Sequence, residues 1–388
     1  MRCSSKFIYS ADMLQYHFHN DHPFNQKRVL LTKELLETSS LLDETDIIAP
    51  RKATEDELAL FHDRRYIEAV KKAGAGLLSP NEAMHFGLDT DDTPVFDHMH
   101  EASSYLVGGT LTAVDAVLNG QADHALNLGG GLHHGFKRKA SGFCIYNDGA
   151  IAIEYIRKNY GMKVLYVDTD AHHGDGVQWA FYEDSDVCTL SIHETGRYLF
   201  PGTGNVNERG IKSGHGYTFN VPIDAFTEDA SFIHIYETAL RHVIEFFKPD
   251  VIVTQNGADA HMYDPLTHLC STMETFEAIP LLAHKLAHEY CDGRWIATGG
   301  GGYDMWRAVP RAWAQIWSVM KTGQVQTGLL PDSWCRNWNK KSPVELPLTW
   351  HDSPNIVPDI PRAPDIAEKN DLALQQVLKY APHSKTCK

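Results

Sequence analysis

Several short runs of apolar and β-branched residues along the chain end in glycine, aspartate or histidine. Runs of this length with such boundaries are typical of strands that are buried on both faces of a sheet. The predicted strands cover residues 125–128, 164–168, 187–192, 219–223, 251–254 and 295–298.

Stretches with helical periodicity separate these runs. Apolar residues recur every three or four positions over residues 149–160, 229–247 and 273–290, which predicts helices with one face toward a core. Because strand and helix alternate, we expect an α/β fold with one doubly wound, mostly parallel sheet flanked by helices. The pattern favours a single domain over residues 1–320.

The composition changes beyond Lys321, where prolines and the tryptophans Trp334, Trp338 and Trp350 interrupt the alternating pattern. A further helix is predicted over residues 365–380. Exposed indoles are uncommon in solvated linkers. We therefore interpret residues 321–388 as a C-terminal extension that packs on the core.

The charge balance narrows the choice of partners. The 388 residues include 35 Lys and Arg against 50 Asp and Glu, a formal net charge of −15. This balance repels polyphosphates, so we expect no direct nucleic-acid binding. Seven scattered cysteines without C-x-x-C spacing indicate neither a disulfide framework nor a thiolate zinc site. With no apolar run of about 18 residues and no signal-peptide core, we expect a cytoplasmic protein that does not span a membrane.

Polar residues gather just after four of the predicted strands, next to glycines. In an open parallel sheet, ligands bind outside the carboxyl ends of the strands, so these residues are expected to converge on one cleft. They are His133 and His134 after the first run, Asp170, His172 and Asp175 after the second, Asp259 after the fifth and Tyr303 after the last.

A metal site is the first chemistry that this pattern predicts. Asp170 and His172 are two residues apart, so in an extended segment both side chains point to the same side. Asp259 can supply a third ligand from another strand end. Two carboxylates and one imidazole suit a catalytic zinc ion, although ferrous iron also fits such a set. The motif H-E-x-x-H of zincin helices is absent.

The remaining residues complete a metal-assisted amidohydrolase. A metal polarises an acyl carbonyl and lowers the pKa of bound water to about 7. His133 and His134 can carry protons, and Asp168 and Asp175 can orient the two rings. The Tyr303 hydroxyl, at the end of a glycine run, can reach the developing oxyanion.

These residues lie in motifs that resemble those of class I histone deacetylases, in the same order. The resemblance spans about residues 17–310 and rests on L-G-G-G-L-H-H-G, S-G-F-C-I-Y-N-D, V-D-T-D-A-H-H-G-D-G-V-Q, F-P-G-T-G, N-G-A-D and G-G-G-G-Y. It implies the arginase/deacetylase-like fold and hydrolysis of acetyl-lysine amides to lysine and acetate.

The resemblance also implies individual roles. Zn²⁺ would be held by Asp170, His172 and Asp259, with His133 paired to Asp168, His134 paired to Asp175, and Tyr303 polarising the acetyl carbonyl. The substrate tunnel corresponds to Gly142, Phe143, Phe200 and Leu266, the rim aspartate to Asp92, and an arginine of the acetate-release cavity to Arg28. A structural K⁺ would be held near Asp168, Asp170, His172 and Ser191.

The sequence departs from the animal deacetylases at His261, two residues after Asp259. We expect His261 at the substrate rim, or else near the metal. Segments from His193 and Asn256, together with the C-terminal extension, resemble a bacterial branch of the family. That branch implies a role in acetoin or acetate metabolism through deacetylation of acetyl-CoA synthetase.

Three alternatives remain. Arginase-like enzymes share the fold but need further aspartates two positions after the ligands His172 and Asp259, where this chain has Gly174 and His261. An acetylpolyamine amidohydrolase would use the same chemistry with a different tunnel entrance. A non-catalytic acyl-lysine reader would have lost a ligand, a histidine or the tyrosine, and none is lost. Oligomeric state, acyl-chain preference and native metal stay open.

Overall fold

The computed structural model describes residues 4–379 and contains a parallel sheet of eight strands in the order β2-β1-β3-β8-β7-β4-β5-β6. Every strand pair among the described residues is parallel, as expected for a doubly wound sheet. The strands are β1 (Ser5–Ile8), β2 (Ile47–Ile48), β3 (His124–Asn127), β4 (Val164–Asp168), β5 (Val187–Glu194), β6 (Thr218–Ile223), β7 (Val251–Gln255) and β8 (Trp295–Thr298).

The strand predictions are confirmed for six members of this order, β3 to β8, with small shifts at their ends. The sequence pattern did not predict β1 and β2. β1 begins with the polar Ser5 and Lys6, and β2 has only two residues, so neither forms the apolar run that marks a strand buried on both faces.

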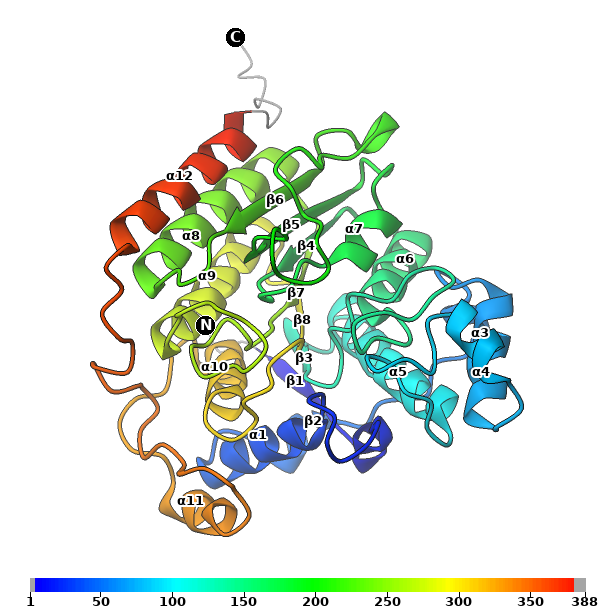
Figure 1. Ribbon diagram of the computed structural model, residues 1–388, viewed down its shortest axis with the longest axis horizontal. Helices are drawn as coiled ribbons and strands as arrows, with labels where there is room; N and C mark the ends of the chain where they lie inside the picture. The colour runs from blue at the N-terminus through cyan, green and yellow to red at the C-terminus, as the bar shows by residue number, and fades with distance from the viewer. Residues whose placement is uncertain (1–3, 380–388) are drawn as a thin grey trace.

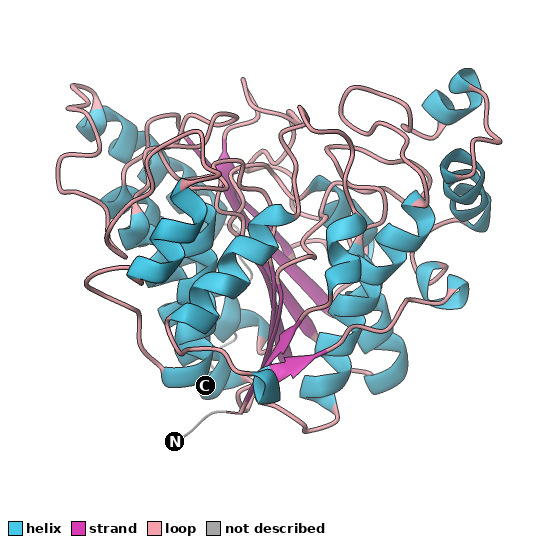
Figure 2. Ribbon diagram, turned by 90° about the horizontal axis from the view of Figure 1, so that it is seen from below, coloured by secondary structure: helices cyan, strands magenta, loops and turns pink. Residues whose placement is uncertain are grey.

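Helices cover both faces of the sheet, which lies between two helical layers with loops gathered at one end (Figures 1 and 2). One layer contains α1 (Lys27–Thr38), α8 (Asp229–Phe247), α9 (Met273–Tyr290), α10 (Val309–Thr322), α11 (Asp332–Asn339) and α12 (Ala363–Lys379). The other contains α2 (Glu55–Leu58), α3 (Arg64–Gly74), α4 (Pro80–His85), α5 (Met99–Leu118), α6 (Asp148–Tyr160) and α7 (Asp175–Ala180).

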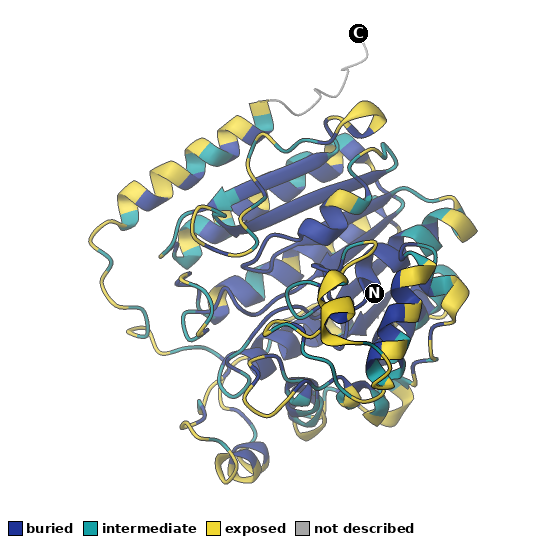
Figure 3. Ribbon diagram, turned by 45° about the vertical axis from the view of Figure 1, so that its right-hand side comes forward, coloured by how far each residue is buried: buried dark blue, intermediate teal, exposed yellow. Residues whose placement is uncertain are grey.

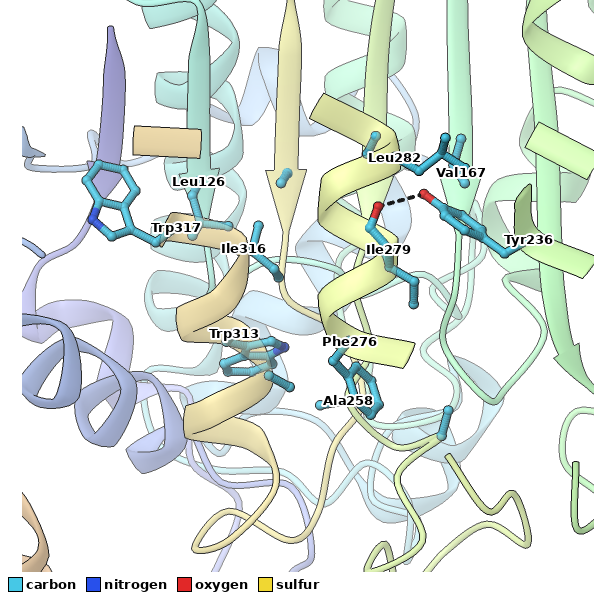
Figure 4. Packing of buried hydrophobic residues seen from close by; sticks show 14 of the residues in the cluster. Leu126, Val167, Tyr236, Ala258, Phe276, Ile279, Leu282, Trp313, Ile316 and Trp317 are labelled. Carbon is cyan, nitrogen blue, oxygen red and sulfur yellow. Dashed lines mark hydrogen bonds between the residues drawn. The ribbon is translucent and has the colours of Figure 1, made fainter. Parts of the chain in front are cut away.

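Alternation along each strand divides the core into two. Leu165 and Val167 of β4 pack with the α8–α10 layer, whereas Val164 and Tyr166 pack with the α5–α6 layer. Figure 4 shows the first of these interfaces, where the Tyr236 hydroxyl also donates to the Ile279 carbonyl at 3.1 Å. Burial on both faces explains the continuous apolar runs in the sequence, and the central strands are dark in Figure 3.

The segment after α10 runs back along the helical layer that contains α1. Trp334 and Trp338 of α11 are buried, and their indole N–H groups donate to the Leu31 carbonyl and to Glu34 Oε2. The predicted last helix is present as α12, which packs on α8 and β6. The division at residue 320 itself stays a prediction. No helix within residues 4–379 has the length and apolarity to cross a bilayer.

Candidate active site

The carboxyl ends of four neighbouring strands bring the predicted site residues together. The sheet order places β3, β8, β7 and β4 side by side, and their last residues are in register: Asn127 with Thr298, Thr298 with Gln255, and Gln255 with Asp168. The segments that follow these ends carry all the predicted metal and proton-transfer residues.

A tight glycine turn after β3 positions the histidine pair. Gly131 has φ +91°, and a Cβ there would lie 2.4 Å from the Gly299 carbonyl oxygen, so only glycine fits between the two strand ends. The buried Asp148 carboxylate at the start of α6 accepts the N–H groups of Gly131 and Leu132. This anchoring fixes the direction in which His133 and His134 leave the turn.

Asp170, His172 and Asp259 converge as a candidate metal centre. All three are buried, and one ligand atom of each lies within 4.8 Å of the others. His172 Nδ1 lies 3.2 Å from Asp170 Oδ1 and 2.9 Å from Asp259 Oδ2. Burial and the neighbouring charge of Asp170 raise the pKa of Asp259 to about 7. A cation between the carboxylates relieves this repulsion, so the donor set fits a divalent metal ion.

Two histidine–carboxylate pairs lie beside this centre. His133 Nδ1 is 2.8 Å from Asp168 Oδ2, and His134 Nδ1 is 2.7 Å from Asp175 Oδ1. The two Nε2 atoms are 3.0 Å apart. Each carboxylate therefore fixes one ring, with its Nε2 directed away from its own partner.

The two rings have opposite pKa shifts. Burial disfavours the charged form of His133, but the carboxylates of Asp168 and Asp170 outweigh it and raise its pKa to about 9. Burial and the positive charge of His133 lower the pKa of His134 to about 4. A cationic and a neutral imidazole thus stand side by side, and neighbouring groups with separated pKa values are typical of acid–base catalysis.

Comparison with known proteins decides the family. The histone deacetylase domain matches residues 22–320. The chain belongs to the histone deacetylase family. This makes it a deacetylase, a hydrolase of a metal-dependent family.

Relatives of this deacetylase match it over almost its whole length. It is 60% identical to the acetoin utilization protein AcuC of Bacillus subtilis over 98% of each chain, and 48% identical to AcuC of Staphylococcus aureus over 94% of each. The crystal structure of an HDAC homologue from Aquifex aeolicus superposes with a TM-score of 0.83 at 31% identity, covering 95% of this chain and 99% of that one. A structure of an HDAC homologue in complex with SAHA gives a TM-score of 0.84.

Two aromatic side chains lie over the deacetylase centre. The Phe200 ring is 5.0 Å from that of His134 and 43% of its surface is exposed, while the Phe143 ring is 5.7 Å from that of Tyr303. A Cβ on Gly142 would meet both His134 and Phe200, so a residue with a side chain does not fit between them.

The roles of Asp92 and Leu266 at the rim stay predictions, and the structure gives the surroundings of each residue. Asp92 is exposed and lies close to His22, whose ring is 4.7 Å from that of Phe143. Leu266 is half-buried in the loop after β7, and its N–H donates to Asp264 Oδ1.

Tyr303 and Arg28 meet at the inner side of the centre. Burial, with the charges of Asp259 and Asp170, raises the pKa of the Tyr303 hydroxyl, which keeps it a hydrogen-bond donor. Arg28 is buried, donates to the Gly302 carbonyl at 2.8 Å and stacks on Phe24. A buried cation next to the tyrosine suits an acetate-binding cavity.

Three residues that the sequence pattern did not single out hold the others in place. Gln255 Nε2 donates to Asp170 Oδ2 at 2.7 Å, and the Tyr166 hydroxyl donates to Asp168 Oδ2 at 3.0 Å. Asp264 accepts the N–H of Tyr303 as well as that of Leu266. Gln255 is the last residue of β7, and this position at a strand end is the one feature of the sequence that could have indicated it as a site residue. No feature of the sequence indicates Asp264 or Tyr166.

The expectations for His261 are corrected by its surroundings. The side chain is fully buried, which excludes the rim, and its Nε2 lies 3.0 Å from Asp352 Oδ2 of the C-terminal extension. It therefore faces the extension, and it is not among the metal-proximal donors. A side chain at Gly174 would collide with Asp168 Oδ2. Neither position supplies a carboxylate for the second metal of an arginase.

Proposed function

We propose that this deacetylase hydrolyses acetyl-lysine amides of proteins to lysine and acetate, with Zn²⁺ as its metal. The observation that supports this most is the grouping of Asp170, His172 and Asp259 beside the His133–His134 pair. An amidohydrolase needs a metal, a base and an acid within reach of one acyl group, and these residues include candidates for the metal ligands, the base and the acid.

Zn²⁺ at these three ligands would supply Lewis-acid polarisation of the acyl carbonyl and a lowered pKa for the attacking water. His134, neutral and held by Asp175, accepts the proton of that water and then delivers it to the departing amine. His133, cationic beside Asp168, stabilises the negative charge that develops. The Tyr303 hydroxyl donates a hydrogen bond to the carbonyl oxygen.

The entrance fits a long aliphatic stem. Phe200 lies against His134 and Phe143 against Tyr303, Gly142 leaves room between His134 and Phe200, and Leu266 lies in the loop after β7. Two aromatic side chains beside the centre favour the methylene chain of an acylated lysine. The exposed Asp92 carboxylate can accept backbone N–H groups of a bound peptide.

A structural K⁺ belongs to the same proposal. Asp168 and Ser191 are register partners on β4 and β5, and Asp168 Oδ1 accepts the Asp170 N–H at 3.2 Å. These residues, together with His172, carry oxygen atoms, and oxygen ligands suit hard cations such as K⁺. Ferrous iron remains the alternative for the catalytic metal, because two carboxylates and one imidazole also accept it.

The physiological substrate that we propose is acetyl-CoA synthetase, in acetoin or acetate catabolism. The support is the likeness over nearly the whole chain to proteins named for acetoin utilization. We place the reaction in the cytoplasm. The five cysteines within the described residues are free and buried, as suits a reducing compartment.

Acetate release tests the proposal. Acetyl-lysine peptides and acetylpolyamines are offered to the wild type and to Tyr303→Phe, with and without a chelator. We expect chelator-sensitive release from the peptides and a loss of about 100-fold or more in kcat for the variant, the size seen when one oxyanion donor is removed.

The other outcomes separate the alternatives. Release from acetylpolyamines alone would make the chain a polyamine amidohydrolase, and peptide binding without any release would make it an acyl-lysine reader. Acetyl-CoA synthetase acetylated at its active-site lysine serves as the protein substrate. If it is deacetylated no faster than an unrelated acetylated protein, the physiological part of the proposal is wrong.

A further inference from the structure

Three histidines meet at the amino-terminal end of the strands, whereas the deacetylase centre lies at their carboxyl ends. His124 is the first residue of β3, while His284 and His288 lie in the last part of α9. The ring centroids are 5.0 Å apart for His124–His284, 5.0 Å for His124–His288 and 4.6 Å for His284–His288. A ring nitrogen of each lies within 4.8 Å of those of the other two.

The backbone explains why these rings converge. His284 and His288 are four residues apart, so they occupy the same face of α9 on successive turns. His124 points to the same side of β3 as Leu126, which packs in the core on the α9 face of the sheet. The strand therefore offers a third imidazole to the helical pair, and the two Nε2 atoms of His124 and His288 are 3.2 Å apart.

The surroundings suit a bound cation. His124 is fully buried, and its Nδ1 makes no hydrogen bond within the described part of the chain. His288 lies in the last turn of α9, where the helix dipole favours positive charge. The Trp295 ring packs against His124 at 5.6 Å and against His284 at 6.4 Å, which gives the cluster an apolar wall.

We propose that His124, His284 and His288 form a second metal site, which binds a divalent transition-metal ion of the Zn²⁺ class. Imidazoles suit Zn²⁺, Cu²⁺ and Ni²⁺, whereas Mg²⁺ and Ca²⁺ require oxygen ligands. Three imidazoles leave one position of a tetrahedral ion for water. An ion at this site cross-links α9 to β3 and touches no residue of the deacetylase centre.

Zinc binding measured by equilibrium dialysis and elemental analysis tests the second site on the full chain. We expect two equivalents of Zn²⁺ in the wild type and one in the double variant His284→Gln, His288→Gln, with unchanged acetate release. The matched control is His85→Gln, an exposed helical histidine, which keeps both equivalents. The affinity for the second equivalent should fall at least about tenfold, because even loss of an outer-shell partner costs roughly 10–100-fold.

A second measurement detects zinc binding at the histidine cluster in a variant whose catalytic metal site has lost a ligand. In an Asp259→Asn background, added Zn²⁺ should raise the melting temperature, and the single exposed replacement His288→Gln should remove that rise. A wild type that binds a single equivalent, a double variant that still binds two, or a rise in melting temperature that survives His288→Gln would each overturn the second site.

Discussion

Gly301 donates its backbone N–H to Asp170 Oδ2 at 2.6 Å, directly beside the metal ligands. A Cβ there would lie 2.1 Å from Asp259 Oδ2 and 2.8 Å from Asp170 Oδ2. The geometry of the centre therefore depends on the backbone of Gly301 as well as on the three ligand side chains. The spacing of Asp170 and His172 could be interpreted from the sequence, whereas this close approach depends on β8 lying next to β7.

Gly301→Ala is expected to displace one or both ligand carboxylates. Metal content and acetate release should both collapse, while circular dichroism still reports a folded chain. Gly149→Ala is the matched control, because a Cβ there meets only ordinary contacts of 3.5 Å or more. A Gly301→Ala protein with normal metal content would show that the ligands tolerate the shift.

The loop after β7 is tied to the C-terminal extension through buried charges. Asp352 lies between His261 and Arg311, with Oδ2 at 3.0 Å from His261 Nε2 and Oδ1 at 2.6 Å from Arg311 Nη2. The N–H of Met273, the first residue of α9, also donates to Asp352. The extension thus braces the loop that carries the ligand Asp259. Composition could indicate that the extension packs on the core, but not which loop it braces.

Asp352→Ala should destabilise the fold by about 3–5 kcal/mol, because it leaves the buried Arg311 guanidinium without its carboxylate. Urea denaturation measures the change. Asp359→Ala, an exposed residue of the same extension, should change stability by less than about 0.5 kcal/mol. Equal urea midpoints for Asp352→Ala and Asp359→Ala would mean that the buried Asp352–Arg311 pair does not stabilise the packing of the extension on the core.

Across the whole molecule, apolar runs identified the central strands because those strands are buried on both faces. The pattern missed α5 as a helix. Its residues are buried around most of its circumference, so no single apolar stripe marks it. The clustering of polar residues at strand ends predicted where the site lies, since all parallel strands end at one edge. Asp264 acts through its contact with Tyr303, which lies 39 residues further along the chain, so no local pattern records it. Tyr166 contacts Asp168 on the same strand, but in the sequence it is only one more residue of an apolar run.

The stability of the whole chain should fall in acid partly through His62. This ring is buried, its Nε2 accepts the Asn147 N–H at 3.0 Å, and burial lowers its pKa from 6.5 to about 3. Below pH 6.5 His62 binds a proton in the unfolded chain but stays neutral in the folded chain. The contribution of His62 is therefore complete above pH 6.5 and is lost as the pH falls toward 3, at about 1.4 kcal/mol per pH unit.

Denaturation of the wild type and of His62→Gln at several pH values measures this contribution. Glutamine keeps an acceptor for Asn147 but does not titrate. The difference in stability between the two proteins should shrink as the pH falls from 6.5. A difference that stays constant over this range would contradict a neutral, buried His62.

Acetate release on restoring the metal tests the central claim most directly. The chain is stripped with a chelator, dialysed, and titrated with Zn²⁺ while acetate is measured from an acetyl-lysine peptide. The account predicts no release by the stripped wild type, recovery as Zn²⁺ binds, and no recovery for Asp259→Asn at the same Zn²⁺ concentrations. Undiminished release by the stripped chain, or full recovery by Asp259→Asn, would contradict a metal-dependent deacetylase centred on Asp170, His172 and Asp259.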